Sequence, residues 1–457
     1  MKLRLGAFLF VSLVLAGVVW YGFQNKARDQ GRNLVLITLD TLRADHLGFY
    51  GYPKPTSPVL DRLAASSIVF DQAISQSAVT PVAHGALFTG LNPYRNGLRS
   101  LHGGEGHSLP ATQTTLAEVM KENGYATAGF VSAFPATRYY GLEQGFEHWD
   151  EDFQGHDGVG HISPTGIVFT GKAQRRGDET LKRAKQWLRD RDESPWFLWL
   201  HLFDVHDAEI LPPVEVLGQF PPAKRESPDI LRAIYDAEIR FIDTQIGSLL
   251  KMLETSKSLK NTVVVVVGDH GEGLGDHDWW GHSILYQEQL RVPFLIHSPS
   301  FSEGRRVSEM VRAVDLLPTM VDLLGVEPPF ELEALDGQSL VPLIEGEDTS
   351  LPVAYSESLN DLFGYQETPF GQDSLYSLND GRWKLILRRR GAQEISTHLF
   401  DLARDPKELT DLSQQEPREA QRLTRLLDGL GAMADGAVPP SMDPEALERL
   451  RSLGYVN

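Results

Sequence analysis

The sequence contains no cysteine among its 457 residues. Disulfides, thiolate nucleophiles, thiolate-based zinc sites and cysteine-linked lipids are therefore excluded. Basic residues are also scarce, because 43 Lys and Arg stand against 62 Asp and Glu and give a formal net charge of −19. A chain this acidic is not expected to bind nucleic acid through a broad basic face. The negative net charge does not exclude a single anion-binding pocket, because a bound cation and a few His or Arg can make a pocket locally positive.

The proportions of apolar and charged residues are those of a folded protein. Hydrophobic residues make up 41% and charged residues 23% of the chain, both close to the average for soluble globular domains. A chain of 457 residues is too long for one small domain and suffices for a large core with an appended subdomain. We therefore expect an ordered fold over most of the length.

The N-terminus carries a long apolar run. Two basic residues precede residues 5–23 and two more follow them. This pattern predicts a signal peptide or an N-terminal membrane anchor over residues 1–30. The run extends past a small-residue cleavage motif at residues 14–16, which favours an anchor; a buried first helix is the alternative, but it would lack a polar face. We expect an exported, periplasmic or cell-envelope protein, anchored by residues 5–23 or cleaved after them.

Beyond this leader, short apolar runs alternate with helical patterns. The apolar runs predict strands at residues 33–39, 126–131, 196–202, 262–267 and 292–296, and the patterns between them predict helices at 115–123, 179–191 and 230–253. Strands that are apolar throughout and separated by helices are typical of a mainly parallel sheet covered on both faces. The sequence therefore predicts an α/β fold for the larger part of the chain.

The pattern changes near residue 365. Two antiparallel strands are predicted at residues 374–379 and 383–389, joined by the turn Asn379-Asp380-Gly381. A further strand at 398–402 and helices at 417–430 and 444–453 follow. We interpret residues 366–457 as a small C-terminal α+β subdomain.

Three groups of polar residues come directly after predicted strands. Asp40 follows the first strand, Asp204 and His206 follow the WFLWLHLF run, and Asp269 and His270 follow the TVVVVV run. In open parallel sheets, ligands bind at the carboxyl ends of the strands. We therefore expect these groups to converge at one edge of the sheet.

The Asp269-His270 pair offers an oxygen and a nitrogen donor to a divalent cation. The imidazole favours Mn²⁺ or Zn²⁺, with Ca²⁺ as an alternative. Alone, such a pair also serves as a cap or a salt bridge, but Asp40 at another strand end strengthens the metal interpretation. The sequence therefore predicts one divalent metal ion as a cofactor.

Thr80 lies where a helix is predicted to begin, because Pro81 and an apolar pattern follow it. A Thr at this place is most simply a helix N-cap. The functional interpretation is a nucleophile, since a helix N-terminus attracts anions and a neighbouring metal lowers the pKa of a hydroxyl. The residues alone leave both interpretations open.

The order of the motifs points to a known family. LITLDTLRADHLGFYGY is followed by TPVAHGALFTGLNPYRNGL, HLFDVHD and VVVVVGDHGEGLGDHDWWGHSILYQEQLRVPFLI, and later by GRWKLI and HLFDLARDPKELTDL. This order resembles bacterial sulfatases of the alkaline-phosphatase superfamily from residue 33 onward. The resemblance implies a catalytic domain over residues 31–365, built on a large mixed, mainly parallel sheet sandwiched by helices. It also implies in-line attack on sulfur or phosphorus by a metal-supported nucleophile.

The resemblance assigns residues to the cation. Asp40, Asp269 and His270 fall at metal-ligand positions. Thr80 falls at the nucleophile, and its oxygen would also touch the metal. Thr41 falls where many sulfatases carry a second Asp; a hydroxyl is a weaker ligand than a carboxylate, so Thr41 is a secondary candidate.

Four histidines fall at positions that face the substrate in relatives. His84 replaces the Arg of the sulfatase signature and His282 replaces a Lys, so both are predicted to bind the transferring group and take part in catalysis. His206 matches the histidine that protonates the leaving group. His102 lies where relatives carry a substrate-holding Asn. For each of these histidines, packing or solvent exposure is the alternative.

Thr80 is the main departure from the family, because sulfatases oxidise a Cys or Ser to formylglycine and Thr cannot form that aldehyde. Superfamily members with a Thr nucleophile resemble phosphodiesterases and phosphoryl transferases. We therefore predict a hydrolase without formylglycine that cleaves anionic phosphodiester, phosphonate or phosphomonoester substrates, or transfers their phosphoryl group. A sulfuric ester hydrolase without formylglycine and a non-catalytic anchored binding module are the alternatives.

Overall fold

The computed structural model describes residues 32–101, 106–153, 173–191, 195–206, 210–224, 226–301, 303–347, 349, 351–359, 373–433 and 443–453, with the backbone of 161–162 and 168–169. The leader predicted at residues 1–30, with its apolar run at 5–23, lies outside these residues. Among the helices that are described, none combines the length and the apolar character needed to cross a bilayer.

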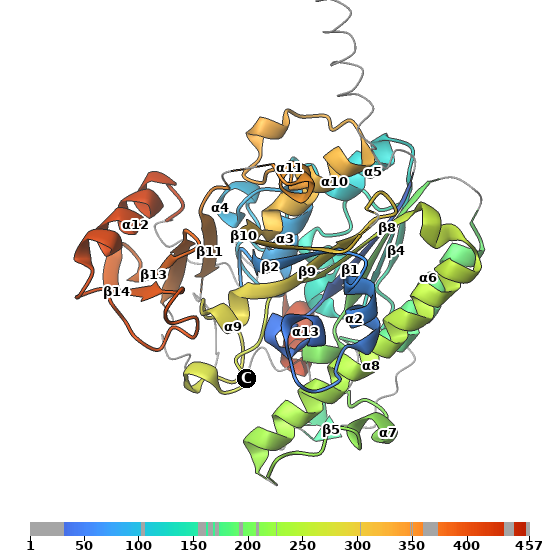
Figure 1. Ribbon diagram of the computed structural model, residues 1–457, viewed down its shortest axis with the longest axis horizontal. Helices are drawn as coiled ribbons and strands as arrows, with labels where there is room; N and C mark the ends of the chain where they lie inside the picture. Colours follow the sequence, from blue (N-terminus) through green and yellow to red (C-terminus); the bar gives the residue numbers. More distant parts are fainter. Residues whose placement is uncertain are drawn as a thin grey trace, which may run out of the picture.

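A central sheet of eight strands forms the body of the molecule (Figure 1). Its strands lie in the order β10 (Arg305–Arg312), β2 (Ile68–Ile74), β9 (Arg291–His297), β8 (Thr262–Gly268), β1 (Asn33–Leu39), β7 (Trp196–Leu202), β3 (Ala126–Val131) and β4 (His148–Asp150). β9 runs antiparallel to both of its neighbours, and all other neighbouring pairs are parallel. The sheet is therefore mixed and mainly parallel, which confirms the predicted fold class.

The sheet separates two hydrophobic cores because successive side chains of a strand point to opposite faces. In β1, Leu34 and Leu36 join one core, whereas Val35, Ile37 and Leu39 join the other. Helices α3 (Thr80–Thr89), α5 (Leu116–Glu122) and α10 (Leu316–Leu324) cover the first face, and α2 (Pro58–Ala64), α6 (Gly177–Arg189) and α8 (Ser227–Thr255) cover the second. Burial on both sides explains why β1, β7 and β8 consist almost entirely of apolar residues.

A second, four-stranded antiparallel sheet lies to one side of the body (Figure 1). Its strands are β11 (Ala354–Leu359), β12 (Ser374–Asn379), β13 (Trp383–Arg390) and β14 (Gln393–Asp401), and α12 (Pro417–Gly429) packs on it. The sheet thus begins at β11, which the sequence placed in the catalytic domain. The helix α13 (Pro444–Ser452) packs on the main body instead of this sheet, because Ala446 and Leu450 join the first core.

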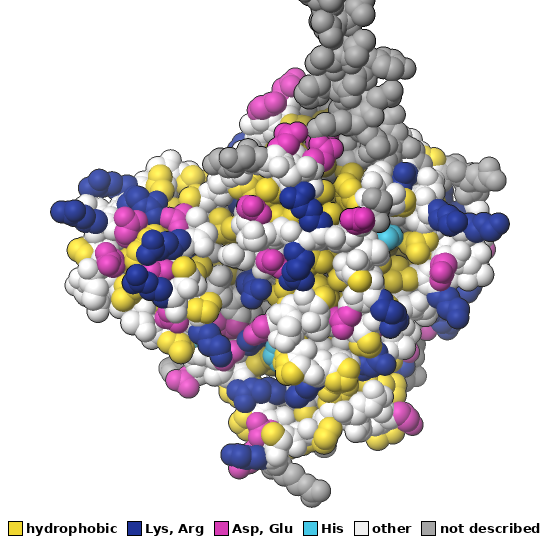
Figure 2. Space-filling model, in the orientation of Figure 1, with side chains coloured by type: hydrophobic (Ala, Val, Ile, Leu, Met, Phe, Trp, Pro, Cys, Tyr) yellow, Lys and Arg dark blue, Asp and Glu magenta, His cyan; other side chains and the backbone are white. Residues whose placement is uncertain are grey.

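Shorter helices and a hairpin complete the described chain. They are α4 (Pro93–Asn96), α7 (Val214–Leu217), α9 (Gln287–Leu290), α11 (Val341–Glu345) and the hairpin of β5 (His161–Ile162) with β6 (Val168–Phe169). On the face shown in Figure 2, basic side chains are interspersed with acidic and neutral ones.

Candidate metal and nucleophile site

The site lies at the carboxyl ends of three adjacent strands. Leu39 at the end of β1 pairs with Gly268 of β8 on one side and Leu202 of β7 on the other. The amide of Asp40 donates to the Leu202 carbonyl at 3.0 Å. These strands are far apart in sequence, and their parallel hydrogen-bond ladders hold them side by side. The predicted convergence of Asp40 and the Asp269-His270 pair is therefore built by the centre of the sheet.

Asp40, Asp269 and His270 form a fully buried cluster whose ligand atoms lie within 4.8 Å of one another. Oδ1 of Asp40 and Oδ2 of Asp269 are buried and accept no hydrogen bond within the part of the chain that the structure describes. Burial raises the pKa of both carboxyl groups, and the charge of Asp40 raises that of Asp269 further. Two unpaired carboxylate oxygens beside an imidazole suit a divalent cation, which would compensate their charge. The residues present fit the predicted metal.

His270 is oriented for such a cation by the main chain. Its Nδ1 lies 3.0 Å from the Gly271 carbonyl, which accepts only, so Nδ1 carries the proton. The lone pair of Nε2 then faces the Oγ1 of Thr80 at 3.3 Å and Oδ2 of Asp269 at 3.6 Å. A histidine whose second ring nitrogen donates to a carbonyl is the common arrangement among metal ligands.

Thr80 is the first residue of α3, with Pro81 in the first turn. Its hydroxyl is fully buried and does not cap the helix, because no residue makes a side-chain cap at this terminus. The hydroxyl lies beside His270 and also beside Asp40, where it lowers the pKa of that carboxyl against the larger effect of burial. The structure therefore brings the candidate nucleophile against two of the three candidate metal ligands.

Thr41 contributes its amide and turns its hydroxyl away. The Thr41 N–H donates to Oδ1 of Asp269 at 3.2 Å, whereas its Oγ1 donates to the Asp40 carbonyl at 2.8 Å. Its φ of 51° is a strained value for a β-branched residue. With its hydroxyl engaged by the backbone, Thr41 supports Asp269 in this structure rather than presenting a ligand oxygen.

His84 forms a bridge between α3 and the sheet. Its Nδ1 donates to the Thr80 carbonyl at 2.7 Å, and its Nε2 accepts from Oγ1 of Thr38 at 2.9 Å. The Thr38 oxygen in turn accepts from Nε1 of Trp199 at 3.0 Å. Burial and the neighbouring His201 lower the pKa of His84 to about 3. Both ring nitrogens of this buried, neutral His84 are occupied, which leaves neither for a substrate oxygen in this arrangement.

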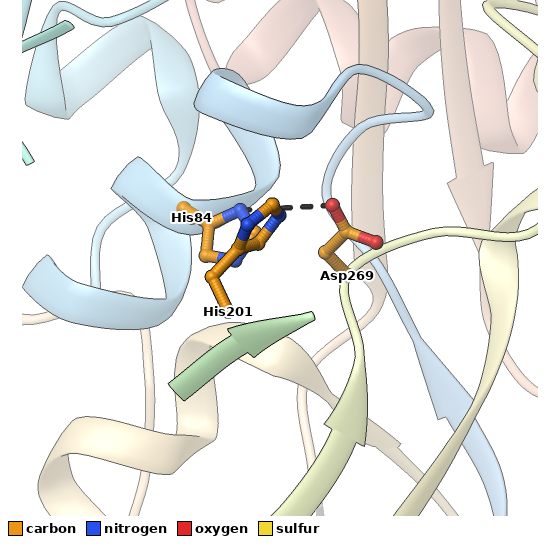
Figure 3. A group of neighbouring side chains, drawn as sticks. All are labelled: His84, His201 and Asp269. Atoms are coloured by element: carbon orange, nitrogen blue, oxygen red, sulfur yellow. Dashed lines mark ion pairs between the residues drawn. The ribbon is translucent and has the colours of Figure 1, made fainter. Parts of the chain in front are cut away.

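A second group of potential ligands consists of His84, His201 and Asp269 (Figure 3). His84 projects from α3, His201 from β7 and Asp269 from the end of β8. The Nδ1 of His84 lies 3.6 Å from Asp269, but it carries the proton given to the Thr80 carbonyl. Since a protonated nitrogen cannot bind a metal, the group of Asp40, Asp269 and His270 is the better metal site.

His206 and His282 form a pair beside this centre. Nδ1 of His282 donates to the Ala78 carbonyl at 2.8 Å, so its Nε2 accepts from Nε2 of His206 at 3.2 Å. The His282 and His270 rings lie 4.6 Å apart, and His206 is only partly buried. Burial lowers the pKa of both, to about 4 for His282. His206 thus presents a proton-bearing Nε2 at the side of the site nearest to solvent.

Asp204, which was expected to converge with these groups, does not join the site. Asp204 accepts from the Gly177 amide with both oxygens, at 3.0 and 2.9 Å, and so supports the start of α6. His102 lies outside the described residues, and its predicted contact with the substrate stays a prediction.

His201, Thr38 and Trp199 were not singled out from the sequence. They lie inside strands that are otherwise apolar, and a single polar residue there is most simply a buried, hydrogen-bonded one. The available signal was their place on neighbouring strands, since Thr38 pairs with His201 in the β1–β7 ladder. The contact between these residues can be predicted only when the register of the β1–β7 ladder is known.

The chain is similar to known sulfatases. The family model described as "Sulfatase" matches residues 32–326, and the one described as "N-sulphoglucosamine sulphohydrolase, C-terminal" matches residues 275–432. An arylsulfatase of Clostridium perfringens is 26% identical over 455 residues, which cover 84% of this chain and 90% of the relative. An ulvan-active sulfatase of Formosa agariphila is 27% identical over 358 residues, covering 72% and 67%.

A solved structure shares the fold. The crystal structure of the phosphonate monoester hydrolase of Agrobacterium radiobacter has a TM-score of 0.70 at 22% identity. The match covers 88% of this chain and 95% of that chain. Both the main body and the C-terminal sheet are therefore shared architecture.

Proposed function

Because the chain belongs to the sulfatase family, whose members are metal-dependent hydrolases of ester bonds, we propose that it cleaves sulfate or phosphonate-type esters with Thr80 as the nucleophile. The observation that carries this proposal is the position of the Thr80 hydroxyl, 3.3 Å from Nε2 of His270 and next to Asp40. A Thr nucleophile acts without formylglycine and favours phosphodiesters and phosphonates, while the arylsulfatase relative supports sulfate esters as the alternative.

Asp40, Asp269, His270 and the Thr80 oxygen would hold the cation, for which the nitrogen donor favours Mn²⁺ or Zn²⁺ over Ca²⁺. A bound cation would lower the pKa of the Thr80 hydroxyl and withdraw charge from the transferring group. Asp40 and Asp269 are placed for this role because each presents one oxygen without a protein partner among the described residues.

In the proposed reaction, the Thr80 hydroxyl gives its proton to solvent, and Oγ1 forms the bond to phosphorus or sulfur while the bond to the leaving oxygen breaks. His206, which takes up a second proton when the anionic substrate binds, gives its Nε2 proton to the leaving oxygen and becomes neutral. Water then attacks the ester on Thr80, neutral His206 takes one proton from this water, and Thr80 Oγ1 leaves and recovers a proton from solvent. His282 orients His206, and it binds an oxygen of the transferring group once the pair has separated.

We assign His84 a positioning role in place of the predicted substrate contact. Its bond to the Thr80 carbonyl, at 2.7 Å, fixes the first turn of α3 and with it the direction of the Thr80 hydroxyl. Thr38 and Trp199 complete this support from the sheet.

The test is hydrolysis of nitrophenyl phosphodiester, phosphonate, phosphomonoester and sulfate substrates with added Mn²⁺, Zn²⁺ or Ca²⁺. Thr80→Ala should lower kcat/KM by at least about 10³-fold, because the nucleophile acts in every turnover. Thr89→Ala is a matched control, since Thr89 is a buried Thr at the other end of α3 and its hydroxyl bonds with Gly85, Leu91 and Asn96 instead of the site residues. A Thr80→Ala variant as fast as the parent would refute the nucleophile. A parent that binds a cation but turns over no ester would favour a non-catalytic binding module.

We also propose export to the periplasm or cell envelope, with attachment through residues 5–23, on the basis of the apolar run and its basic flanks. Fractionation of cells producing the full chain or a chain lacking residues 1–30 tests this. The full chain should sediment with membranes or appear in the exported fraction, and the shortened chain should stay in the cytoplasm.

A further inference from the structure

We propose that His201 positions Asp40 for the cation by holding one carboxylate oxygen and leaving the other free to bind. This inference rests on the proposed metal centre and adds a residue to it. His201 is fully buried in β7, and its Nε2 lies 3.0 Å from Oδ2 of Asp40. The HLFDVHD motif begins with this residue, but the resemblance assigns it no role.

The two oxygens of Asp40 differ in their hydrogen bonding. Oδ2 accepts the His201 ring proton, whereas Oδ1 is buried and receives no hydrogen bond from the described residues. A carboxylate on a single carbon can turn about its side-chain bonds, and a donor on one oxygen fixes the direction of the other. The amide of Asp40 is meanwhile held by the Leu202 carbonyl, next to His201 in the same strand. β7 therefore anchors Asp40 through both its main chain and its side chain.

The register of the sheet places His201 for this contact. His201 pairs with Thr38 of β1, two residues before Asp40, so both point to the face that α3 covers. His84 of α3 lies against His201, with ring centroids 5.2 Å apart, and closes the space above it. Packing from the helix thus limits the ring to orientations in which Nε2 faces Asp40.

The stability of the strand does not account for a histidine at this position. Nδ1 of His201 is buried and has no hydrogen-bond partner within the described part of the chain. A buried polar atom without a partner costs about 1–3 kcal/mol, and the neighbours Leu200 and Leu202 are apolar and fully buried. An apolar residue would suit this strand better. Among the described residues, the bond to Asp40 is the one side-chain hydrogen bond that an apolar residue at this position would lose.

His201 is not itself a ligand in this account. Its Nε2 is engaged with Asp40, and among the described residues the one group of potential ligands that includes it is His84, His201 and Asp269. His84 gives its Nδ1 proton to the Thr80 carbonyl, so that group lacks a third ligand. His201 therefore acts through Asp40.

The test measures cation affinity directly, with Mn²⁺ as the probe, by calorimetric titration of protein stripped with EDTA. His201→Leu should weaken Mn²⁺ binding by about 10–100-fold, the usual effect of losing a residue that orients a metal ligand. His201→Gln keeps an N–H close to the position of Nε2 and should restore most of the affinity. The unfolding midpoint of cation-free His201→Leu should stay near that of the parent, because the unpaired buried nitrogen is removed while Oδ2 of Asp40 loses its donor.

Leu200→Ala is the matched control. Leu200 is the preceding residue of β7, fully buried in the opposite core, so its truncation should cost about 2–5 kcal/mol without touching Asp40. Its Mn²⁺ affinity should stay at the parent value. If His201→Leu binds Mn²⁺ as tightly as the parent, or if Leu200→Ala weakens binding equally, the positioning role is refuted.

The outcomes also separate this inference from the proposed function. A parent that binds Mn²⁺ and a Thr80→Ala variant that stays fully active would refute the nucleophile and leave the role of His201 intact. A cation-dependent parent with unchanged Mn²⁺ binding in His201→Leu would refute the role of His201 alone. A parent that binds none of Mn²⁺, Zn²⁺ and Ca²⁺ would refute the metal centre and His201 together.

Discussion

Replacing Asp269 with Asn should stabilise the cation-free protein and abolish its response to the cation. Oδ1 of Asp269 accepts from the amides of His270 at 2.7 Å and Thr41 at 3.2 Å, and the amide oxygen of Asn keeps both bonds. Oδ2 has no hydrogen-bond partner among the described residues and lies 3.6 Å from the accepting Nε2 of His270. An amide NH₂ at that place would donate to His270 and remove a charge from beside Asp40.

The size of the effect follows from burial. A buried polar atom without a partner costs about 1–3 kcal/mol, so Asp269→Asn should gain about that amount without the cation. At roughly 2.1 cal/mol/K per residue, the unfolding entropy of a chain of 457 residues is about 1 kcal/mol/K. The melting temperature should therefore rise by about 1–3 °C. A cation at 100 times its dissociation constant adds about 2.7 kcal/mol, or about 3 °C, to the parent only.

The assay is calorimetric melting of EDTA-stripped parent and variant, with and without Mn²⁺. Asp322→Asn serves as a control. Asp322 belongs to α10, away from the site, and its carboxylate accepts a hydrogen bond from the Ser339 hydroxyl. A cation-free Asp269→Asn protein that melts below the parent would show that the unpaired oxygen of Asp269 does not destabilise the cation-free parent. A variant that still gains the full Mn²⁺ shift would show that Asp269 is not a ligand.

Two further predictions concern an ion pair of the C-terminal subdomain and a histidine of the loop after His270. Lys384 and Glu408 form an ion pair at 2.7 Å with both side chains fully buried. Lys384→Met should lower the free energy of unfolding in urea by about 3–5 kcal/mol, because it leaves a buried charge unpaired, and adding Glu408→Gln should recover most of this loss. A double variant no more stable than Lys384→Met would contradict this prediction. Burial lowers the pKa of His277, but the bond to Glu288 raises it above 6.5 overall. A raised folded-state pKa adds stability below 6.5 that is lost as the pH rises through the folded-state value. The urea midpoint of the parent should thus fall as the pH rises from neutral to mildly alkaline, and the midpoint of His277→Gln should change less. An equal pH dependence of the two midpoints would refute the contribution of the His277–Glu288 bond.

Local patterns predicted most of the sheet. The apolar runs at residues 33–39, 196–202 and 262–267 became β1, β7 and β8 with nearly the same bounds, because their length and the lack of polar residues leave burial between helices as the stable solution. The strand β11 could not be recognised in the same way, since its polar residues Ser356, Glu357 and Ser358 are buried by tertiary contacts. The place of α13 likewise depends on a surface far away in sequence.

The candidate site was predicted in part. Strand ends and the motif order pointed to Asp40, Asp269, His270 and Thr80, and the structure brings these four together. Hydrogen-bond direction could not be read from the sequence, and it decides which residues face the cation. It turns the Thr41 hydroxyl to the backbone and occupies both nitrogens of His84.

The large sequence separations within the site affect folding kinetics. Thr41 and Asp269 are 228 positions apart, and Thr80 and His270 are 190 apart, so only Asp269 and His270 are neighbours in the unfolded chain. A cation has no combined set of ligands until β1, β8 and α3 have all assembled, and such long-range contacts form late. Interactions absent from the folding transition state change the rate of unfolding and leave the rate of folding nearly unaltered. The bound cation should therefore slow unfolding of the native protein and leave its folding rate nearly unchanged.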